Sequence, residues 1–433
     1  RIVLMGFSMG GAGAWHVGAH YADHWVAVSP GAGFAETKEY IKLKPENYPS
    51  PYVQTLWGTY DIPLYVRNLF NVPVVAYSGE IDKQIQAAQV MERAFIAEGQ
   101  TLTHIIGPKM GHRYAPESLA DIMQRMEHAA TTGQVDVPSE IHLQTRTLRY
   151  NRMHWVQALQ LTQHWLDSRI DGKIRDNGVV DIQTTNITCF QIEKKIFGPL
   201  GPLRSVIIDG NSISLPEKQS RATVVFTRVE KNWKLGDHRA AGISKGPQLQ
   251  GPIDDAFLDP FLVVLPSGVS KNPQVERWIK FESQHFLDRW RSLYRGTPRI
   301  KLDKFVTKED QQNYNLILWG DFQTNSVLKQ LLSNSFTKTG VIQWDTKQLH
   351  INNKDYDVRT HVPILITPNP TAPEKYIVIN SGPTHREGHD RTNSLQNPKL
   401  PDWAVIDITT APNDVVPGKI VDAGFFDEYW KYK

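Results

Sequence analysis

A Gly-x-Ser-x-Gly pentapeptide near the start of the chain constrains the fold more than any other feature. Gly6-Phe7-Ser8-Met9-Gly10 follows an apolar run, Ile2–Met5, and overlaps the start of a Gly- and Ala-rich helical pattern over Met9–Tyr21. Between a strand and a helix, this pattern predicts a tight turn that holds the serine in a strained backbone conformation and needs glycines on both sides. The sequence therefore predicts that Ser8 is a nucleophile presented at the end of a parallel sheet.

A serine hydroxyl becomes a good nucleophile when a histidine takes its proton and an acid orients that histidine. On sheets with such a turn, the chain order is serine, acid, histidine, and the acid and the histidine each follow a strand. Asp82 follows the apolar run Val72–Tyr77, and His112 follows Leu102–Ile106. We therefore predict a triad of Ser8, His112 and Asp82, with the backbone N–H of Met9 as one donor of the oxyanion hole.

Two other residues compete for these roles. Glu80 is the rival acid, although it also suits a helix cap or an exposed loop. His104 is the rival base, but it falls inside a predicted strand, where a packed or half-exposed side chain is expected.

The periodicity of apolar residues divides the chain into three predicted domains. Strand and helix patterns alternate over residues 1–131, which predicts a parallel α/β sheet. After a linker at 132–138, residues 138–240 predict an antiparallel β domain, and residues 246–433 predict a second α/β domain. The β domain is predicted from five runs with a period of two, which are Ile141–Tyr150, Val156–Leu161, Val179–Glu193, Ser205–Leu215 and Thr223–Val229.

Residues 1–131 resemble α/β-hydrolases. Gly6–Trp15 and Trp25–Gly33 are similar to the elbow and the next strand of the prolyl-oligopeptidase-like (peptidase S9-like) branch and of the depolymerase or feruloyl-esterase-like branch. Ser78–Asp82 and Gly111-His112 are similar to the acid and histidine segments of that group. The resemblance implies a serine hydrolase that works through an acyl-enzyme. A prolyl-oligopeptidase-like peptidase is the first hypothesis for its activity, and a carboxylic ester hydrolase is the alternative.

The resemblance also implies strands before the elbow, which carry the loop with the second oxyanion donor. This chain opens with Arg1 inside an apolar run. We therefore expect residues 1–131 to be the C-terminal half of an α/β-hydrolase sheet, incomplete at its N-terminus and nearly inactive by itself. A third hypothesis is a vestigial hydrolase that acts as a binding or scaffold protein, because most of the chain lies outside the catalytic segment.

Composition excludes several other classes of protein. The net charge is +3 with scattered basic residues, so no nucleic-acid partner is predicted. A membrane-spanning helix needs about 18 consecutive apolar residues, and every apolar run in this sequence is much shorter, so no membrane span is predicted. The single cysteine, Cys189, rules out an internal disulfide. The predicted partner is a peptide or ester substrate, and we predict no cofactor. Export to the periplasm or outside the cell is suspected, with its signal outside this chain.

Several clusters were weighed as sites and declined, so no metal is predicted. His16 and His20 share one helical face but have no third ligand in the pattern, so packing is expected. The cluster His385–Asp390 fits a ligand loop less well than an exposed polar loop. The indoles of Trp155, Trp165 and Trp233 are expected to pack in a core, with a sugar-stacking platform as the alternative. Asn186-Ile187-Thr188 matches a glycosylation acceptor inside a predicted strand.

Overall fold

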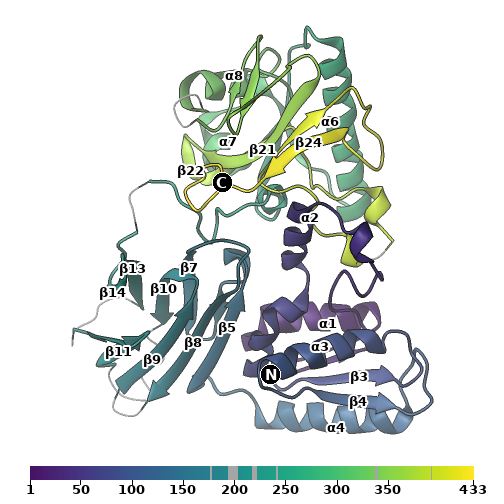
Figure 1. The fold of residues 1–433 in the computed structure, drawn as a ribbon, viewed down its shortest axis with the longest axis vertical. Helices are drawn as coiled ribbons and strands as arrows, with labels where there is room; N and C mark the ends of the chain where they lie inside the picture. The colour runs from purple at the N-terminus through teal and green to yellow at the C-terminus, as the bar shows by residue number, and fades with distance from the viewer. Residues whose placement is uncertain (176–177, 194–202, 217–221, 240–241, 337–339, 392) are drawn as a thin grey trace. The chain divides into compact units, whose positions relative to one another are not determined.

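The chain forms two compact units in a computed structural model, which describes residues 1–433 apart from 176–177, 194–202, 217–221, 240–241, 337–339 and 392 (Figure 1). The first unit comprises Arg1–Tyr48 and Trp57–Ala241, and the second comprises Pro49–Leu56 and Gly242–Lys433. The boundaries expected near residues 131 and 138 and near 240 and 246 remain predictions. No helix among the described residues is long and apolar enough to cross a membrane.

A parallel sheet of four strands opens the first unit. Among the residues that the structure describes, the strands follow one another in chain order, and β1 is an edge strand of the sheet. They are β1 (Val3–Phe7), β2 (Ala27–Gly31), β3 (Val75–Gly79) and β4 (Thr103–Gly107). The strands end one or two residues later than the apolar runs predict. Three of them, β2, β3 and β4, end in a glycine that is still paired and carries no hydrophobic signal.

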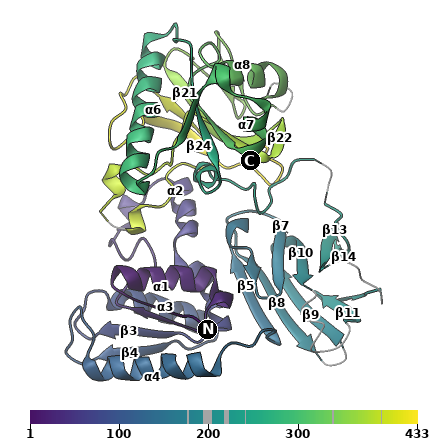
Figure 2. The same ribbon diagram turned by 180° about the vertical axis from the view of Figure 1, so that it is seen from behind.

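Helices cover both faces of this sheet, as Figure 2 shows from behind. Helices α1 (Met9–His20) and α3 (Ile85–Ala97) lie on one face, and α4 (Pro116–Thr132) lies on the other. Successive strand residues point to opposite faces, so one set is buried under α1 and α3 and the other under α4. The first set includes Val28 and Ala76 with Trp15 and Met91, and the second includes Ala27 and Val75 with Ile122 and Met126.

The first unit also contains a β-sandwich of two five-stranded sheets. One sheet has the order β12-β11-β9-β8-β5, from β5 (Glu140–Thr145), β8 (Ser168–Arg175), β9 (Val179–Thr185), β11 (Ser205–Ile208) and β12 (Asn211–Ser214). The other has the order β14-β13-β10-β7-β6, from β6 (Arg152–Met153), β7 (Val156–Leu161), β10 (Ile187–Glu193), β13 (Thr223–Val229) and β14 (Asn232–Leu235). The five predicted runs did not include β6, β8 or β14.

Two details of the sandwich correct the sequence analysis. The run Val179–Glu193 was expected to be one strand, but it is β9 and β10, which belong to different sheets and meet at Asn186. Asn186 has φ 57°, a left-handed conformation that asparagine tolerates better than most residues. The domain was also expected to be antiparallel, but β11 pairs with β9 in parallel, because the intervening β10 lies in the other sheet.

Two of the three tryptophans considered as a sugar platform are core residues instead. The side chains of Trp155 and Trp233 are 0% and 5% exposed. Their indole N–H groups donate to Pro138 O and to an oxygen of Asp209. A stacking platform needs an open ring face, so these two residues do not provide one.

An ion-pair network joins the sandwich to the α/β part of the first unit. The guanidinium of Arg67, in the 3-10 helix Ile62–Asn71, lies 2.7 Å from Glu98 and 2.5 Å from Asp171 on β8. Arg169, also on β8, reaches the same Glu98 at 2.8 Å. Apolar residues of both parts share one hydrophobic core beneath these pairs. The α/β sheet and the sandwich are therefore a single packed body.

The second unit is built on a mixed sheet of seven strands in the order β16-β15-β17-β22-β21-β23-β24. The first four strands run parallel and the remaining ones pair antiparallel. They are β15 (Phe261–Leu265), β16 (Arg299–Leu302), β17 (Asn315–Leu318), β21 (His361–Asn369), β22 (Ala372–Ile379), β23 (Trp403–Asp407) and β24 (Lys419–Gly424).

Helices and a small sheet complete the second unit. The helices are α2 (Pro51–Leu56), α6 (Pro273–Tyr294), α7 (Lys308–Asn313) and α8 (Ser326–Leu331). The small sheet is formed by β18 (Gln343–Trp344), β19 (Leu349–Ile351) and β20 (Lys354–Tyr356). The long helix α6 presents Val275, Trp278 and Phe286 to the core.

Burial of His20 on α1 makes the first unit sensitive to acid. Its ring is 6% exposed, stacks on Tyr150 at 3.5 Å and meets the edge of Tyr65 at 4.5 Å. Neither ring nitrogen has a hydrogen-bond partner among the described residues. Burial, and then the nearby His16, lower the pKa of His20 well below its usual value. The folded chain therefore holds a neutral imidazole that becomes protonated only on unfolding.

We expect the free energy of unfolding to fall as the pH drops below about 6.5, the pKa of an unfolded histidine. The contribution of His20 is about 1.4 kcal/mol for each pH unit below that value. His20→Phe should remove this slope, so that between pH 6.5 and pH 5 the variant gains about 2 kcal/mol relative to the parent. Denaturant unfolding at both pH values measures the difference. His24→Phe, at a side chain that is 63% exposed, should leave the slope as it is.

Candidate active site

The turn between β1 and α1 has the geometry that a nucleophile elbow requires. Ser8 has φ 58° and ψ −117°, a conformation that a residue with a side chain rarely adopts. Its N–H donates to Gly31 O of the neighbouring strand at 2.8 Å, which holds the turn against the sheet. A Cβ added at Gly6 would lie 2.0 Å from Gly10 O, so only glycine fits there. The strained conformation is therefore maintained by its surroundings.

Steric exclusion does not require the second glycine of the motif, contrary to the expectation that both flanking positions need glycine. A Cβ at Gly10 would meet nothing within 4 Å, so no side chain is excluded at that position. The close approach involves the carbonyl of Gly10, which packs against Gly6. At Gly11, by contrast, a Cβ would lie 2.2 Å from Gly31 O. On the helix side of the turn, the position that requires glycine is therefore Gly11, which packs against the end of β2.

The loops that follow β3 and β4 are bonded to each other. Glu80 N–H donates to Gly107 O at 3.0 Å, and Ile81 N–H donates to Met110 O at 2.9 Å. A Cβ at Gly79 would lie 2.2 Å from the carbonyl oxygen of Gly111, so the two loops pack backbone to backbone. This contact fixes the acid and the histidine relative to each other.

Ser8, His112 and Asp82 form a continuous hydrogen-bonded chain. His112 Nε2 lies 2.8 Å from Ser8 Oγ, and His112 Nδ1 lies 2.8 Å from Asp82 Oδ2. An ionised carboxylate only accepts, so Nδ1 carries the proton and Nε2 is free to accept from the serine hydroxyl. Asp82 is 6% exposed, and its other oxygen accepts from Gln84 N–H at 3.0 Å. The arrangement can therefore withdraw a proton from Ser8.

Aromatic residues that the sequence analysis did not identify hold the histidine in place. The ring of Phe7 lies 4.9 Å from that of His112 and 4.7 Å from that of Tyr114. Tyr77 Oη donates to Arg113 O and accepts from Ala115 N–H, both at 2.8 Å, which anchors the loop behind the imidazole. Tyr77 lies in a buried strand and belongs to no recognisable motif. Its role in anchoring the loop can therefore be seen only in the folded structure.

The rival acid and base are engaged elsewhere. Glu80 is exposed, and its carboxylate accepts from Lys109 N–H at 2.7 Å. His104 Nδ1 lies 2.9 Å from Glu92 Oε1, and its side chain is 3% exposed. Neither residue joins the chain of bonds that ends at Ser8.

The start of α1 lies directly behind the nucleophile. Met9 is the first residue of α1, so its N–H is one of the four at a helix start that have no partner within the helix. This N–H follows Ser8 directly, which is the position of an oxyanion-hole donor in an elbow of this type. The positive end of the helix dipole adds to the attraction for a developing negative charge.

Comparisons with known proteins give only distant relatives. No family model matches the chain. A curated protein named "Uncharacterized secreted protein" from Arthroderma benhamiae is 23% identical over 273 residues, which are 59% of this chain and 29% of that protein. The matched part of the chain thus spans less than a third of that relative's length.

Solved structures match just under a third of the chain. An S-formylglutathione hydrolase from Staphylococcus aureus is 16% identical, with 29% of this chain and 53% of that chain covered and a TM-score of 0.24. A ferulic acid esterase (18% identical, 30% and 51% covered, TM-score 0.23) and esterase B from Lactobacillus rhamnosis (17%, 30% and 52%, TM-score 0.25) are similar to the same extent. The parallel sheet, the elbow and the bonded side chains together fit the α/β-hydrolase superfamily.

Proposed function

We propose that this chain carries the catalytic segment of a serine hydrolase. The single observation that supports the proposal is the hydrogen-bonded series from Ser8 Oγ through His112 to Asp82, at 2.8 Å for each bond, built on a strained elbow. The same series argues against a vestigial hydrolase, because a chain released from catalytic selection has no need to keep an orienting acid buried beside the imidazole.

In the proposed reaction, Ser8 Oγ attacks a carbonyl carbon while His112 Nε2 takes the hydroxyl proton. The carbonyl oxygen becomes negatively charged, and Met9 N–H donates to it. His112 then passes the proton to the leaving group as its bond to carbon breaks, which leaves an acyl group on Ser8. A water molecule, deprotonated in turn by His112, releases the acid and restores the serine.

We further propose that the substrate is a carboxylic ester. The Gly10-Gly11-Ala12-Gly13 sequence after the nucleophile suits esterases. Two large apolar side chains are exposed directly beside triad residues, Met9 at 63% and Ile81 at 71%. Exposed apolar groups at a reactive site favour a substrate with an apolar acyl or aryl group, since its burial there is favourable.

A prolyl-oligopeptidase-like peptidase is the second candidate. The observation that favours it is the sequence of the acid and histidine segments, Ser78–Asp82 and Gly111-His112, which are similar to those of that branch. Peptidase activity remains a prediction here. Export from the cell is a further proposal, supported by the word "secreted" in the name of the distant fungal relative.

A substrate panel separates the two candidates. We expect the chain to hydrolyse aryl esters of acetic, butyric and ferulic acids at least tenfold faster than proline-containing peptide anilides, compared as kcat/KM. Labelling of the same samples with a fluorophosphonate probe reports whether the serine is activated at all. Faster cleavage of the anilides would overturn the ester proposal, and absence of labelling would overturn the hydrolase.

A further inference from the structure

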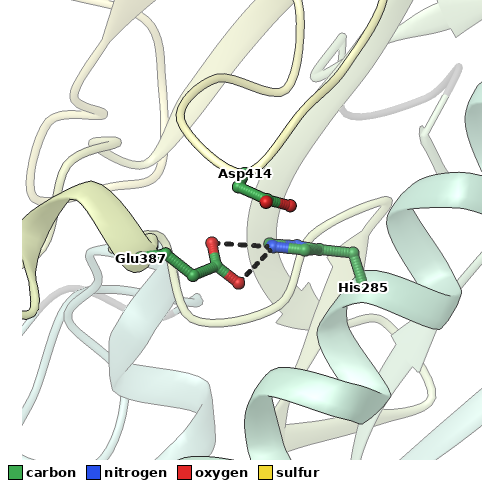
Figure 3. Close-up of side chains that lie close together, drawn as sticks. All are labelled: His285, Glu387 and Asp414. Carbon is green, nitrogen blue, oxygen red and sulfur yellow. Dashed lines mark hydrogen bonds and ion pairs between the residues drawn. The ribbon is translucent and has the colours of Figure 1, made fainter.

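A second cluster of reactive side chains lies in the C-terminal unit, apart from the proposed hydrolase site. His285 is on α6, Glu387 is in the short 3-10 helix Glu387–His389 that follows β22, and Asp414 is in the loop between β23 and β24 (Figure 3). One ligand atom from each of the three lies within 4.8 Å of the others. Glu387 belongs to the His385–Asp390 segment, which the sequence analysis had judged to be an exposed polar loop.

We propose that His285, Glu387 and Asp414 bind a divalent first-row transition metal ion, with zinc as the strongest candidate. His285 Nε2 lies 3.0 and 3.1 Å from the two oxygens of Glu387. Two ligands bound to one tetrahedral zinc ion at about 2.1 Å stand about 3.4 Å apart, so these atoms already have nearly the right spacing. Asp414 is exposed, and one of its carboxylate oxygens lies within 4.8 Å of the other two ligand atoms.

The supporting residues hold the three ligands from behind. Arg386 forms a buried two-point ion pair with Glu282, at 2.9 and 3.0 Å, and it also donates to Asn413 O. Glu282 lies one helical turn before His285, Arg386 directly precedes Glu387, and Asn413 directly precedes Asp414. This network ties together the three segments that carry the proposed ligands.

The charges around the cluster match a divalent cation. Arg289 lies 3.2 Å from Glu387 Oε1, which leaves Oε2 as the ligand atom, and it also pairs with Asp390 at 2.9 Å. One arginine therefore serves two carboxylates, and with Asp414 the cluster has an excess of two negative charges. An imidazole nitrogen among the ligands favours zinc and its neighbours over magnesium or calcium, which prefer oxygen alone. Three protein ligands leave at least one position open to water.

Metal titration of the full chain tests this proposal. Protein stripped with a chelator and dialysed is titrated with Zn²⁺ by calorimetry, and with Co²⁺ while its visible absorption is recorded. We expect Zn²⁺ binding and cobalt bands in the parent, and no binding of Mg²⁺ at the same concentrations. Asp414→Asn and His285→Asn should each weaken Zn²⁺ binding at least tenfold.

His350 provides the matched control, because it is a surface histidine 2.7 Å from a single carboxylate, Asp355. His350→Asn should leave the high-affinity Zn²⁺ binding unchanged. Asp414 is exposed, so Asp414→Asn tests the site even if His285→Asn fails to fold. Absence of Zn²⁺ binding in the parent, or equal binding in the parent and Asp414→Asn, would overturn the proposal and leave the cluster as a hydrogen-bonded group without a metal.

Discussion

Ser8→Ala is expected to abolish fluorophosphonate labelling and to reduce ester hydrolysis by about 10⁶-fold, the usual loss when the nucleophile of such a triad is removed. The substitution removes only the hydroxyl group, whose oxygen lies 2.8 Å from His112 Nε2. Alanine keeps the Cβ, and the turn is held by the bond from the backbone of residue 8 to Gly31 O, so the fold should persist. Probe labelling and rates of ester hydrolysis, compared between the variant and the unsubstituted protein, check the loss of activity, and circular dichroism checks the fold.

The control for this experiment is an exposed serine outside the site. Ser292→Ala, on the exposed side of α6, removes a hydroxyl that donates to Arg289 O within its own helix. Its labelling should equal that of the parent. If Ser8→Ala retained labelling, the nucleophile would lie elsewhere and the triad would be wrongly assigned.

Asp82→Asn is expected to lower kcat by about 10⁴-fold while the protein remains folded. The carboxylate accepts from Nδ1 of His112, which keeps Nε2 unprotonated and able to take the serine proton. An asparagine amide in its place can donate to Nδ1, which puts the ring proton on Nε2 and blocks that transfer. Steady-state rates of ester hydrolysis by the variant and the parent measure the loss.

Glu80→Gln is the matched control for Asp82→Asn, since the two acids are two residues apart in the same loop. The carboxylate of Glu80 accepts from Lys109 N–H, and a glutamine oxygen can accept the same bond. The rate should therefore stay near that of the parent. A larger loss for Glu80→Gln than for Asp82→Asn would show that Glu80 is the acid.

Much of the proposed hydrolase site could be predicted from the sequence, because its chemistry is tied to local patterns. A serine between two glycines, after an apolar strand and before a helix, can adopt few conformations. Steric exclusion at Gly6 restricts the turn further, so its conformation is determined by residues close together in the sequence. Asp82 and His112 were found by the same logic, since each follows an apolar run. The sequence distinguished Asp82 from Glu80 less clearly. Both acids lie in the same loop, and only the backbone conformation of that loop decides which carboxylate faces His112.

The sandwich shows where periodicity is insufficient. Alternation of apolar and polar residues identified β7 and β13 at their observed bounds. The alternation shifts phase by one residue near Asn186, where the buried positions change from even numbers (Ile182) to odd ones (Ile187). A phase shift by itself does not reveal that β9 and β10 belong to different sheets. Alternation reports which side chains are buried, whereas strand pairing depends on where the chain turns.

What the sequence determined by itself was the elbow, the order of the triad residues and the alternation of strands and helices over the first part of the chain. These features depend on neighbours in the chain, whose sterics and periodicity are fixed by residue type. The tertiary structure decided which acid meets His112, which aromatic rings support it, and that His285, Glu387 and Asp414 come together. Such groups are far apart in sequence, so their approach depends on loops and packed elements that no local pattern encodes.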